Sequence, residues 1–511
     1  MDETRITRRA FVAASAAPLT LSAAGCLAPT LKMGLPNVSA IPEVPNGTLV
    51  NDVHSKLNAT RVAEIVRPHT VDAAHDVFRL ATKTGRRVAI AGGRHAMGGQ
   101  QFAENAVLVD SRSLNRVIAF DRERGIVSVE GGIQWPALFG YLESAQRDAA
   151  QQWGIFQKQT GADRLSLGGA LSCNAHGRAL TLKPIIQQVE SFELLMPTGE
   201  LCRCSRTENA ELFRLAIGGY GLFGLITRVD LRLRPRVKVQ RIVELSETFG
   251  LMPRFAERIR DGYLYGDYQF ATDSRRDSFL RRGVFSCYRP VPIETPLTEN
   301  PTRFNPEDWA RLTYYSHRFK QRAFNVYSKR YVATSGQIYW ADWQLSAAYV
   351  DNYHDDLDRA LGGPRATEMI TEIYVPRDRF EAFMEDARRS LVANGANIIY
   401  GTVRLIERDD ESVLAWAREP WACIVFNLHV EHTEDGVARA SGAFRELIDC
   451  GIAHGGSYYL TYHRWARRDQ VERCYPQMRE FLALKRRYDS DDRLVSTWYE
   501  HYMRLLAPTL T

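Results

Sequence analysis

The stretch that decides the fold is Ala91-Gly92-Gly93-Arg94-His95-Ala96-Met97-Gly98-Gly99-Gln100. An apolar run at 87–91 leads into this loop and another at 106–110 follows it, so the sequence predicts a strand, a loop and a strand. A tight turn needs one or two glycines, whereas this loop has four in eight residues. Glycines let backbone amides turn inward and approach an anion closely. We therefore interpret the loop as a nest for a pyrophosphate.

The sequence around this loop predicts an α+β lobe. Helix periodicity runs from Thr60 to Thr84 and ends at Gly85. Alternating segments on either side of turn residues predict two hairpins, which pair 117–120 with 126–130 and 190–196 with 201–204. The lobe is expected to end near Pro235. Residues 237–475 mix amphipathic helices with strand-like runs, which predicts a second α+β domain.

A second glycine pattern, at 219–224, matches the GxGxxG motif of Rossmann folds, and Glu244 lies where a ribose-binding acid would be expected. That motif has to follow a strand and open a helix. Here a helix-like segment, 210–217, precedes the glycines and an alternating segment, 225–233, follows them. We therefore reject the Rossmann interpretation, and NAD(P) remains a distant alternative as cofactor.

Four further motifs follow the first glycine loop in order: Leu165-Ser166-Leu167-Gly168-Gly169-Ala170-Leu171-Ser172-Cys173-Asn174-Ala175-His176-Gly177, Val189-Glu190-Ser191-Phe192-Glu193, Pro197-Thr198-Gly199-Glu200, and Glu211-Leu212-Phe213 through Gly224. The five motifs together resemble the vanillyl-alcohol oxidase superfamily. The resemblance implies an α+β fold with a two-subdomain PCMH-type FAD-binding domain at 59–236 and a substrate, or cap, domain at 237–475. It also implies a C-terminal segment, 476–511, that returns to the flavin domain.

The resemblance further implies which residues hold FAD. These are Gly92, Gly93, Arg94, His95, Ala96, Gly98, Gly99, Gly168, Gly169, Ser172, Asn174, His176, Gly177, Gly224 and Ile226. In related loops the histidine is often bonded covalently to the flavin, so His95 inherits this role by resemblance. A noncovalent His95 that only orients the loop is the alternative. For His176 the alternative is a hydrogen-bonded core histidine.

Candidate catalytic residues lie in the C-terminal half. In the sugar-lactone, alditol and decaprenylphosphoryl-ribose oxidase branch, which the chain resembles, a Glu-x-Arg motif binds and activates the substrate. The matching stretch here keeps Arg404 but has Thr402 in place of the glutamate, so another base or another substrate is implied. Glu372 resembles a second branch motif, with a surface carboxylate as the alternative. His463 is expected to share a strand face with Tyr459 and Thr461, with an aromatic packing strand as the alternative.

These features predict an FAD-dependent oxidoreductase that oxidises a CH–OH group of a sugar, polyol or aldonolactone by hydride transfer. Oxygen or a quinone-like carrier is the expected electron acceptor, and the sequence does not separate an oxidase from a dehydrogenase. One alternative is an amine or phenol oxidase of cytokinin or berberine-bridge type, since Gly98-Gly99-Gln100 resembles the cytokinin group. A non-catalytic exported flavin-binding protein is the other alternative.

Composition and the N-terminus indicate the expected partners and the cellular location. The net charge of +6 comes from interleaved charges without dense basic tracts, so nucleic acid is not expected as a partner. Eight cysteines in 511 residues do not make a disulfide scaffold, and no segment predicts a metal site. Arg8 and Arg9 precede a short apolar run, which resembles a twin-arginine export signal over 1–25 and implies a periplasmic or cell-envelope location. Cys26, which opens a lead segment at 26–58, resembles a lipidation site for peripheral membrane attachment.

Overall fold

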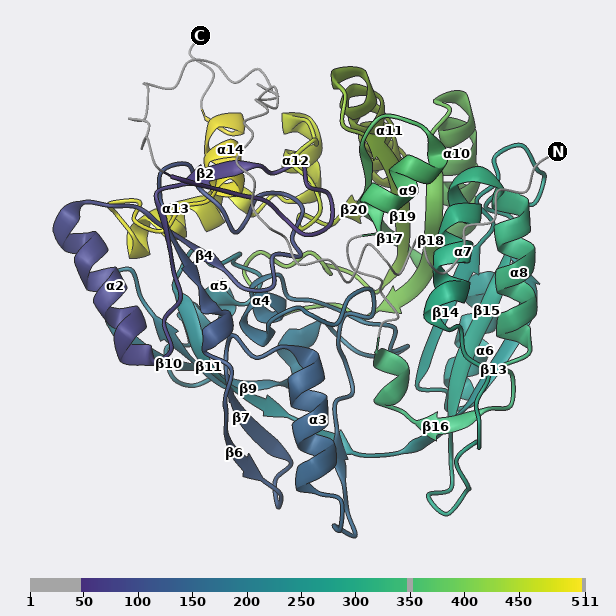
Figure 1. The fold of residues 1–511 in the computed structure, drawn as a ribbon, viewed down its shortest axis with the longest axis horizontal. Coiled ribbons are helices and arrows are strands. Elements are labelled where there is room, and N and C mark those ends of the chain that lie inside the picture. Colours follow the sequence, from purple (N-terminus) through teal and green to yellow (C-terminus); the bar gives the residue numbers. More distant parts are fainter. Residues whose placement is uncertain (1–46, 347–352, 508–511) are drawn as a thin grey trace.

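The computed structural model describes residues 47–346 and 353–507. The predicted export signal and Cys26 lie outside the described residues, as does the lead segment before residue 47. The described chain is a mixed α+β structure in which an N-terminal lobe, residues 47–235, faces a large sheet formed by the following residues (Figure 1). Every helix within the two described ranges is too short or too polar to cross a membrane.

The first glycine loop joins two strands of a small parallel sheet. β4 (Val88–Ala91) ends at the loop and β5 (Val107–Asp110) follows it, while β3 (Glu64–Val66) pairs with the other edge of β5. The predicted strand-loop-strand unit is therefore confirmed. Because the strands run parallel, the loop begins at the carboxyl end of β4 and returns to the start of β5.

The predicted helix at 60–84 is wrong in its first part. Only α2 (Val71–Thr84) is helical, whereas β2 (Thr60–Val62) pairs with β1 (Thr48–Val50) and is followed by β3. Pro68 explains the break, because a proline removes a backbone donor and disfavours helical geometry in the residue before it. The helix then begins where the Thr70 side chain accepts a hydrogen bond from the Ala73 amide, and it ends at Gly85 with a left-handed φ of 66°.

A five-stranded antiparallel sheet forms the rest of the lobe, in the order β10-β9-β11-β7-β6. Its strands are β6 (Val117–Asp121), β7 (Ile126–Glu130), β9 (Val189–Leu195), β10 (Leu201–Ser205) and β11 (Leu225–Arg232). Both predicted hairpins are present, as β6 with β7 and β9 with β10. The glycines at 219–224 follow α5 (Ala210–Ala216) and lead into β11, so the order of elements agrees with rejecting a Rossmann unit. The lobe also contains α3 (Trp135–Ala145), α4 (Leu167–Ser172), and the short pair β8 (Trp153–Gly154) and β12 (Arg234–Pro235).

The large sheet has eight strands in the order β16-β13-β15-β14-β18-β19-β17-β20. Their bounds are β13 (Lys238–Glu247), β14 (Tyr265–Phe270), β15 (Arg282–Val291), β16 (Ile338–Trp340), β17 (Ala366–Pro376), β18 (Ile398–Ile406), β19 (Trp421–Glu431) and β20 (Ser457–Tyr458). Side chains alternate between the two faces of a strand. Glu368, Ile370 and Glu372 therefore share one face of β17, which we call the cavity face.

Helices cover both faces of this sheet (Figure 1). On the cavity face lie α7 (Pro306–Arg318), α8 (Lys320–Val332) and α9 (His354–Leu361), and both His317 of α7 and His354 contact Glu368. The other face packs against α6 (Leu251–Arg260), α10 (Phe380–Ala393) and α11 (Glu434–Ala453). At Gly451 of α11, an added Cβ would lie 2.8 Å from the Ile373 side chain, which shows how closely this helix approaches the sheet.

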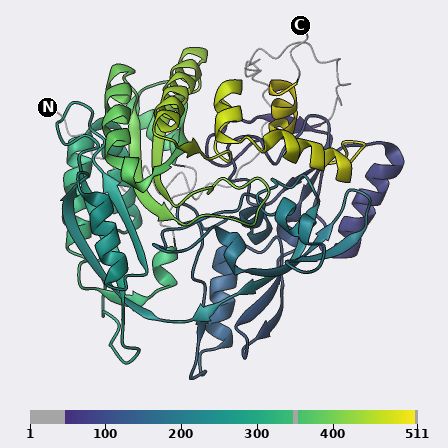
Figure 2. The ribbon, with the colours of Figure 1, turned by 180° about the vertical axis from the view of Figure 1, so that it is seen from behind.

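The C-terminal helices return to the N-terminal lobe. They are α12 (Arg468–Cys474), α13 (Met478–Tyr488) and α14 (Thr497–Leu505). The Val88 amide donates to the Arg493 carbonyl at 2.7 Å, and the Val495 amide donates back to the Val88 carbonyl at 3.0 Å. Arg87 and Glu500 form an ion pair at 2.6 Å. Both views show these yellow helices beside the purple N-terminal elements (Figures 1 and 2), so residues near the C-terminus complete the lobe that carries the glycine loop.

Candidate active site

The first glycine loop packs so closely on the second glycine segment that side chains are excluded. A Cβ on Gly92 would lie 1.9 Å from Ser166 Oγ, and a Cβ on Gly93 would lie 2.2 Å from the Arg164 carbonyl. Arg94 has a left-handed φ of 61°, which places the loop backbone in a conformation uncommon for a residue with a side chain. The glycines at these two positions are therefore required by contact with residues 164–166.

The two glycine segments line a cavity that we call the loop cavity. It holds about 1460 Å³ of space free of protein atoms, part of it open to solvent. Eleven of the predicted cofactor residues line it: Gly92, Gly93, Arg94, His95, Ala96, Gly168, Gly169, Ser172, His176, Gly224 and Ile226. Arg94 Nε and Gln101 Oε1 are buried without a hydrogen-bond partner in the protein. A glycine-walled cavity with unsatisfied polar atoms fits a large phosphate-bearing cofactor such as FAD.

The other four predicted cofactor residues do not line the loop cavity but contact the residues next to it: Gly98, Gly99, Asn174 and Gly177. Gly99 has a φ of 76°, and a Cβ there would lie 2.2 Å from Thr497 Oγ1. Gly98 donates its amide to Gln100 Oε1 at 3.0 Å. A Cβ on Gly177 would lie 2.4 Å from the Lys158 carbonyl. These contacts, and those of Asn174 described below, fix the backbone rather than face the cavity.

His95 contacts a second histidine. Its Nδ1 lies 2.7 Å from Nε2 of His54, and both rings line the loop cavity. Burial, together with the nearby His354, lowers the pKa of His54 to about 4, so His54 is neutral at physiological pH. A neutral His54 shares one proton with His95 across this contact.

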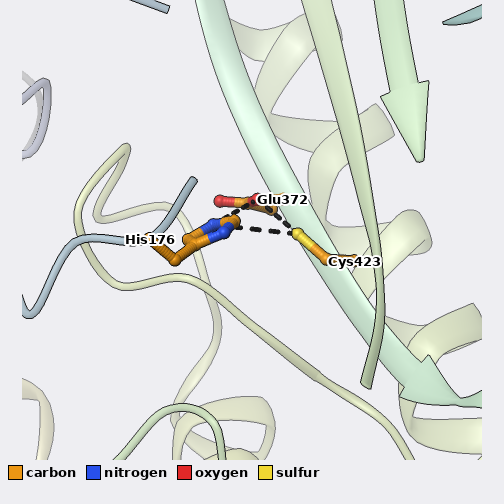
Figure 3. A group of neighbouring side chains, drawn as sticks. All are labelled: His176, Glu372 and Cys423. Atoms are coloured by element: carbon orange, nitrogen blue, oxygen red, sulfur yellow. Dashed lines mark hydrogen bonds and ion pairs between the residues drawn. The ribbon is translucent and has the colours of Figure 1, made fainter. Parts of the chain in front are cut away.

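A buried acid–base cluster adjoins the loop cavity. His176 Nε2 lies 2.8 Å from Glu372 Oε1, and the Cys423 thiol donates to the same oxygen (Figure 3). Burial favours the neutral acid, but the contacts with His176, Cys423 and Arg404 outweigh it and lower the pKa of Glu372. Glu372 Oε2 is buried and has no partner. The structure therefore places an ionised carboxylate directly behind a histidine that faces the cavity.

The sheet register relates this carboxylate to the altered Glu-x-Arg stretch. Glu372 lies opposite Val425 on β19, and Val425 lies opposite Thr402 on β18. The three residues thus form one row across neighbouring strands, and Glu372 lies two strands, or about 10 Å, from Thr402. The row supplies a carboxylate on the same face of the sheet as the position where the related branch has its glutamate.

Arg404 stands where the loop cavity meets a second one, the sheet cavity. Arg404, Tyr400 and Ile370 line both. The sheet cavity extends along the cavity face of the sheet and beneath α7 and α8, with Arg178, Asp267, Gln269 and Asn427 among its polar lining. Arg404 Nε is buried without a hydrogen-bond partner. A guanidinium at this junction can contact an oxygen of a molecule that spans the two cavities.

Two predicted catalytic residues lie outside both cavities. Thr402 is fully buried, and its Oγ1 has no hydrogen-bond partner. His463 lies on the opposite side of β17, where its Nε2 is 3.0 Å from Thr371 Oγ1 and its ring stacks on Phe444. Burial lowers the pKa of His463 to about 3, with Arg445 adding to the effect, so its ring is neutral.

The strand predicted through His463 is wrong beyond Tyr458, where β20 ends. The chain then turns, so Tyr459, Thr461 and Tyr462 line the loop cavity while His463 points into the core. The turn returns to the first glycine loop, because the Gln100 side chain donates to the carbonyls of Leu460 and Thr461. These tertiary contacts override the strand alternation.

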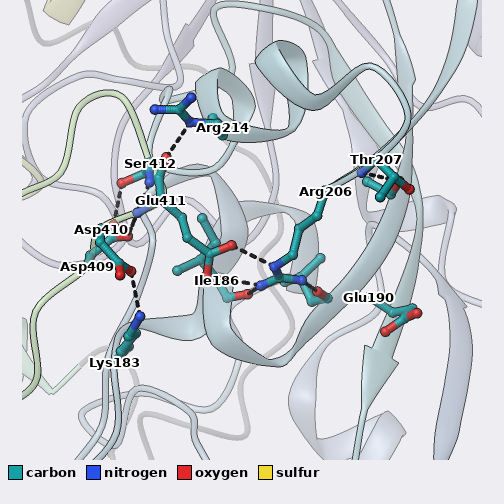
Figure 4. Close-up of polar contacts among 12 residues, drawn as sticks. Lys183, Ile186, Glu190, Arg206, Thr207, Arg214, Asp409, Asp410, Glu411 and Ser412 are labelled. Carbon is teal, nitrogen blue, oxygen red and sulfur yellow. Dashed lines mark hydrogen bonds and ion pairs between the residues drawn. The ribbon is translucent and has the colours of Figure 1, made fainter.

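Asn174 connects the two halves of the chain. With a left-handed φ of 49°, it donates to Asp409 Oδ2 at 2.8 Å and accepts from the Ile186 amide. The Asp409 loop is itself held to the N-terminal lobe (Figure 4), where Glu411 pairs with Arg206 at 2.6 Å and Lys183 pairs with Asp410. The loop therefore fixes the backbone next to His176.

Sequence reasoning missed several residues of the cavities. His54, Tyr400 and Tyr462 line the loop cavity, and Arg178 and Asp267 line the sheet cavity 3.5 Å from each other. Alternation on β18 could have indicated Tyr400, which has the same facing as Arg404. His54 lies in an irregular segment that carries no periodic signal.

Comparisons with known proteins agree with this architecture. The family model described as "FAD binding domain" matches residues 62–205. The chain is 27% identical to L-gulonolactone oxidase from Bos taurus over 85% of this chain and 93% of that protein. It is 36% identical to cytokinin dehydrogenase 3 from Oryza sativa subsp. japonica over 49% of this chain and 47% of that protein. It is 28% identical to L-gulono-1,4-lactone dehydrogenase from Mycobacterium tuberculosis over 38% of this chain and 43% of that protein.

Proposed function

We infer that the chain, whose residues 62–205 match the FAD-binding domain model, is an FAD-dependent oxidoreductase of the PCMH type, and from that premise we propose that it oxidises a CH–OH group of a sugar, polyol or aldonolactone-like substrate. The observation that carries this proposal is the junction of the two cavities at Arg404. FAD fits one cavity, and a substrate in the other would meet it beside a cation and a histidine–carboxylate pair.

The polar lining of the sheet cavity supports a polyhydroxylated substrate. Gln269 Oε1 and Asn427 Oδ1 are buried acceptors without partners, while Arg178 Nε and Arg404 Nε are buried donors without partners. A hydroxyl group both donates and accepts, so a chain of hydroxyls can satisfy both kinds of atom. Leaving such groups unpaired costs about 1–3 kcal/mol each, which gives the cavity a preference for a ligand of this kind.

Each residue of the site has one task in the proposed reaction. When bound, FAD supplies the two-electron acceptor for the hydride. Arg404 holds the substrate oxygen through its guanidinium and stabilises the negative charge that develops there. His176 takes the hydroxyl proton at Nδ1, which lies 3.2 Å from the Gly177 carbonyl oxygen, because Glu372 accepts the Nε2 hydrogen at 2.8 Å and stabilises the imidazolium that forms. The thiol of Cys423 holds Glu372 in place. Tyr459 and Tyr462 cover the site and exclude water.

A phenolic or amine donor is the second candidate function. Trp309, Phe324, Tyr327 and Tyr331 give the sheet cavity an aromatic wall, on which a flat ring could stack. Similarity to plant cytokinin dehydrogenases over about half of the chain supports this candidate independently.

A donor panel under anaerobic conditions tests the proposal. The purified flavin-loaded protein is mixed with aldonolactones, alditols and aldoses, and separately with phenols and cytokinins, while flavin bleaching is recorded. Bleaching by the hydroxylated donors supports the proposal, and bleaching by the aromatic set alone replaces it with the second candidate. Failure of every donor to bleach the flavin would contradict the proposal and favour the alternative of a non-catalytic flavin-binding protein. Reoxidation by air or by a soluble quinone then separates an oxidase from a dehydrogenase.

The domain limits and location also remain proposals. We propose a flavin domain at 59–236 that the 476–511 segment completes, with a substrate domain at 237–475 between them. We also propose export through the twin-arginine-type signal, with Cys26 as a peripheral membrane anchor. Arg8→Lys with Arg9→Lys should retain the protein in the cytoplasm, whereas Cys26→Ser should release it from membranes without changing export. Equal fractionation of both variants and the parent would contradict these assignments.

A further inference from the structure

A group of histidines surrounds one carboxylate at the far end of the cavity face. Glu368 of β17 lies four residues before Glu372, about 13 Å along the strand. Three histidines approach it: His317 of α7, His354 at the start of α9, and His429, which lies directly opposite on β19. We call these four residues the Glu368 cluster. The mechanism above uses none of them.

The donor atoms of this cluster lie close together. His317 Nε2 is 2.9 Å from Glu368 Oε1, and His354 Nε2 is 3.3 Å from Glu368 Oε2. The ligand atoms of His317, Glu368 and His429 all lie within 4.8 Å of one another. Tyr353 also donates its hydroxyl to Glu368 Oε2. Three elements, α7, α9 and β19, thus bring imidazole nitrogens to one carboxylate on β17.

The hydrogen bonds of His317 require a proton or a metal ion between its ring and Glu368. Its Nδ1 lies 2.8 Å from the Thr313 carbonyl oxygen, which can only accept, so Nδ1 carries a hydrogen. In a neutral ring Nε2 then presents a lone pair to Glu368 Oε1, which is another acceptor. Two acceptors at 2.9 Å need a cation between them, and that cation is either a proton or a metal ion.

Two features favour a metal ion. A metal-binding histidine commonly donates its other ring N–H to a backbone carbonyl, as His317 does to Thr313. Zn–N and Zn–O bonds of about 2.0–2.1 Å in a tetrahedral site separate ligand atoms by about 3.4 Å. This separation lies between the 2.9 Å contact of His317 with Glu368 and the 4.8 Å within which all three ligand atoms lie. His429 Nδ1 is also buried without a hydrogen-bond partner.

We propose that the Glu368 cluster binds one divalent transition-metal ion, of which Zn²⁺ is the reference, through Glu368 and the imidazoles of His317 and His429, with His354 beside Glu368 as a neighbour of the site. Glu368 and His354 line the sheet cavity, so the ion stands in the wall of that cavity. A further coordination position there would accept water or an oxygen of a bound molecule. This inference does not depend on the substrate, because the binding of a metal is measured without one.

Metal content of the full-length flavin-loaded protein tests this proposal. The protein is stripped with a chelator, dialysed against Zn²⁺ or Co²⁺, desalted and measured by elemental analysis. About one ion per chain is expected, and Co²⁺ should give the visible absorption of a tetrahedral site at wavelengths beyond the flavin bands. Glu368→Gln and His317→Gln should each weaken binding by about tenfold or more. Metal near background in the unaltered protein would overturn the proposal and make the cation a proton.

Two control variants exclude other sites. His454→Gln removes a similar histidine–carboxylate pair, since His454 Nε2 lies 2.8 Å from Asp386 Oδ2 on the other side of the sheet. Cys423→Ser alters the His176–Glu372–Cys423 group, which is the other set of close donors among the described residues. Both variants should keep the metal. Loss of the metal in Cys423→Ser with retention of the metal in Glu368→Gln would place the ion at the His176–Glu372–Cys423 group and refute the inference. Thermal unfolding with and without the metal checks that each variant is folded.

Discussion

Gly92→Ala tests how the glycine loop forms the cofactor site. The new Cβ would lie 1.9 Å from Ser166 Oγ and 3.0 Å from Ser166 Cβ, far inside normal contact. Ser166 cannot turn away freely, because its Oγ accepts the Gly169 amide and caps α4. Losing this cap costs about 1 kcal/mol, and overpacking costs about 1–3 kcal/mol. We expect a total of about 2–4 kcal/mol, divided between the free energy of unfolding and the binding of FAD.

The assay follows thermal unfolding and flavin content of the purified variant at several FAD concentrations. Gly92→Ala should lower the unfolding temperature and retain less flavin than the parent. Gly140→Ala is the matched control, since Gly140 lies in α3 and an added Cβ meets nothing within 4 Å. That change should be neutral or slightly stabilising. Gly92→Ala with unchanged stability and flavin content would refute the claim that close packing of the two loops forms the site.

Three other predictions concern Glu372, His463 and His95. The pKa of Glu372 is lowered in the folded state, so its stabilising contribution is present above its usual pKa of 4.5 and is lost on acidification through the lower folded value. Glu372→Gln should therefore reduce the loss of unfolding free energy at acidic pH. An equal loss in the variant and the parent would contradict the pairing with His176. The pKa of His463 falls from 6.5 to about 3 on folding, so the parent loses stability as pH drops from 6.5 towards 3. His463→Phe should reduce this loss and keep kcat in the donor assay. A large fall in kcat with intact flavin would instead show a catalytic role for His463. Acid precipitation should leave yellow colour on the parent but not on His95→Ala, and flavin released from both proteins would exclude a covalent bond at His95.

The fold was predictable where the chain makes local structure. The strands around the first glycine loop and both hairpins came from apolar alternation and turn residues, which are properties of neighbouring residues. The start of α2 was not predictable from the sequence. Residues 60–62 pair with β1, residues 64–66 pair with β5, and Pro68 separates both segments from α2. Likewise, the turn after Tyr458 is set by contacts of Gln100 with residues far along the chain.

The candidate site was predictable only in part. Glycines and Arg404 were found because a motif places them in sequence. The pairing of Glu372 with His176 joins residues 196 positions apart, and the row that relates Glu372 to Thr402 depends on strand order. The Glu368 cluster draws on two helices and two strands, so no spacing in the sequence indicates it.

The most direct test of the central claim is the rate of flavin reduction in Arg404→Met, measured by rapid anaerobic mixing with the best hydroxylated donor. Arg404 stands at the junction of the two cavities, and removing a charge-stabilising donor typically costs about 10²–10³ in rate. We predict a loss of that size with flavin content and unfolding temperature unchanged. Reduction at the parent rate would contradict the account, because the substrate would then react away from this junction.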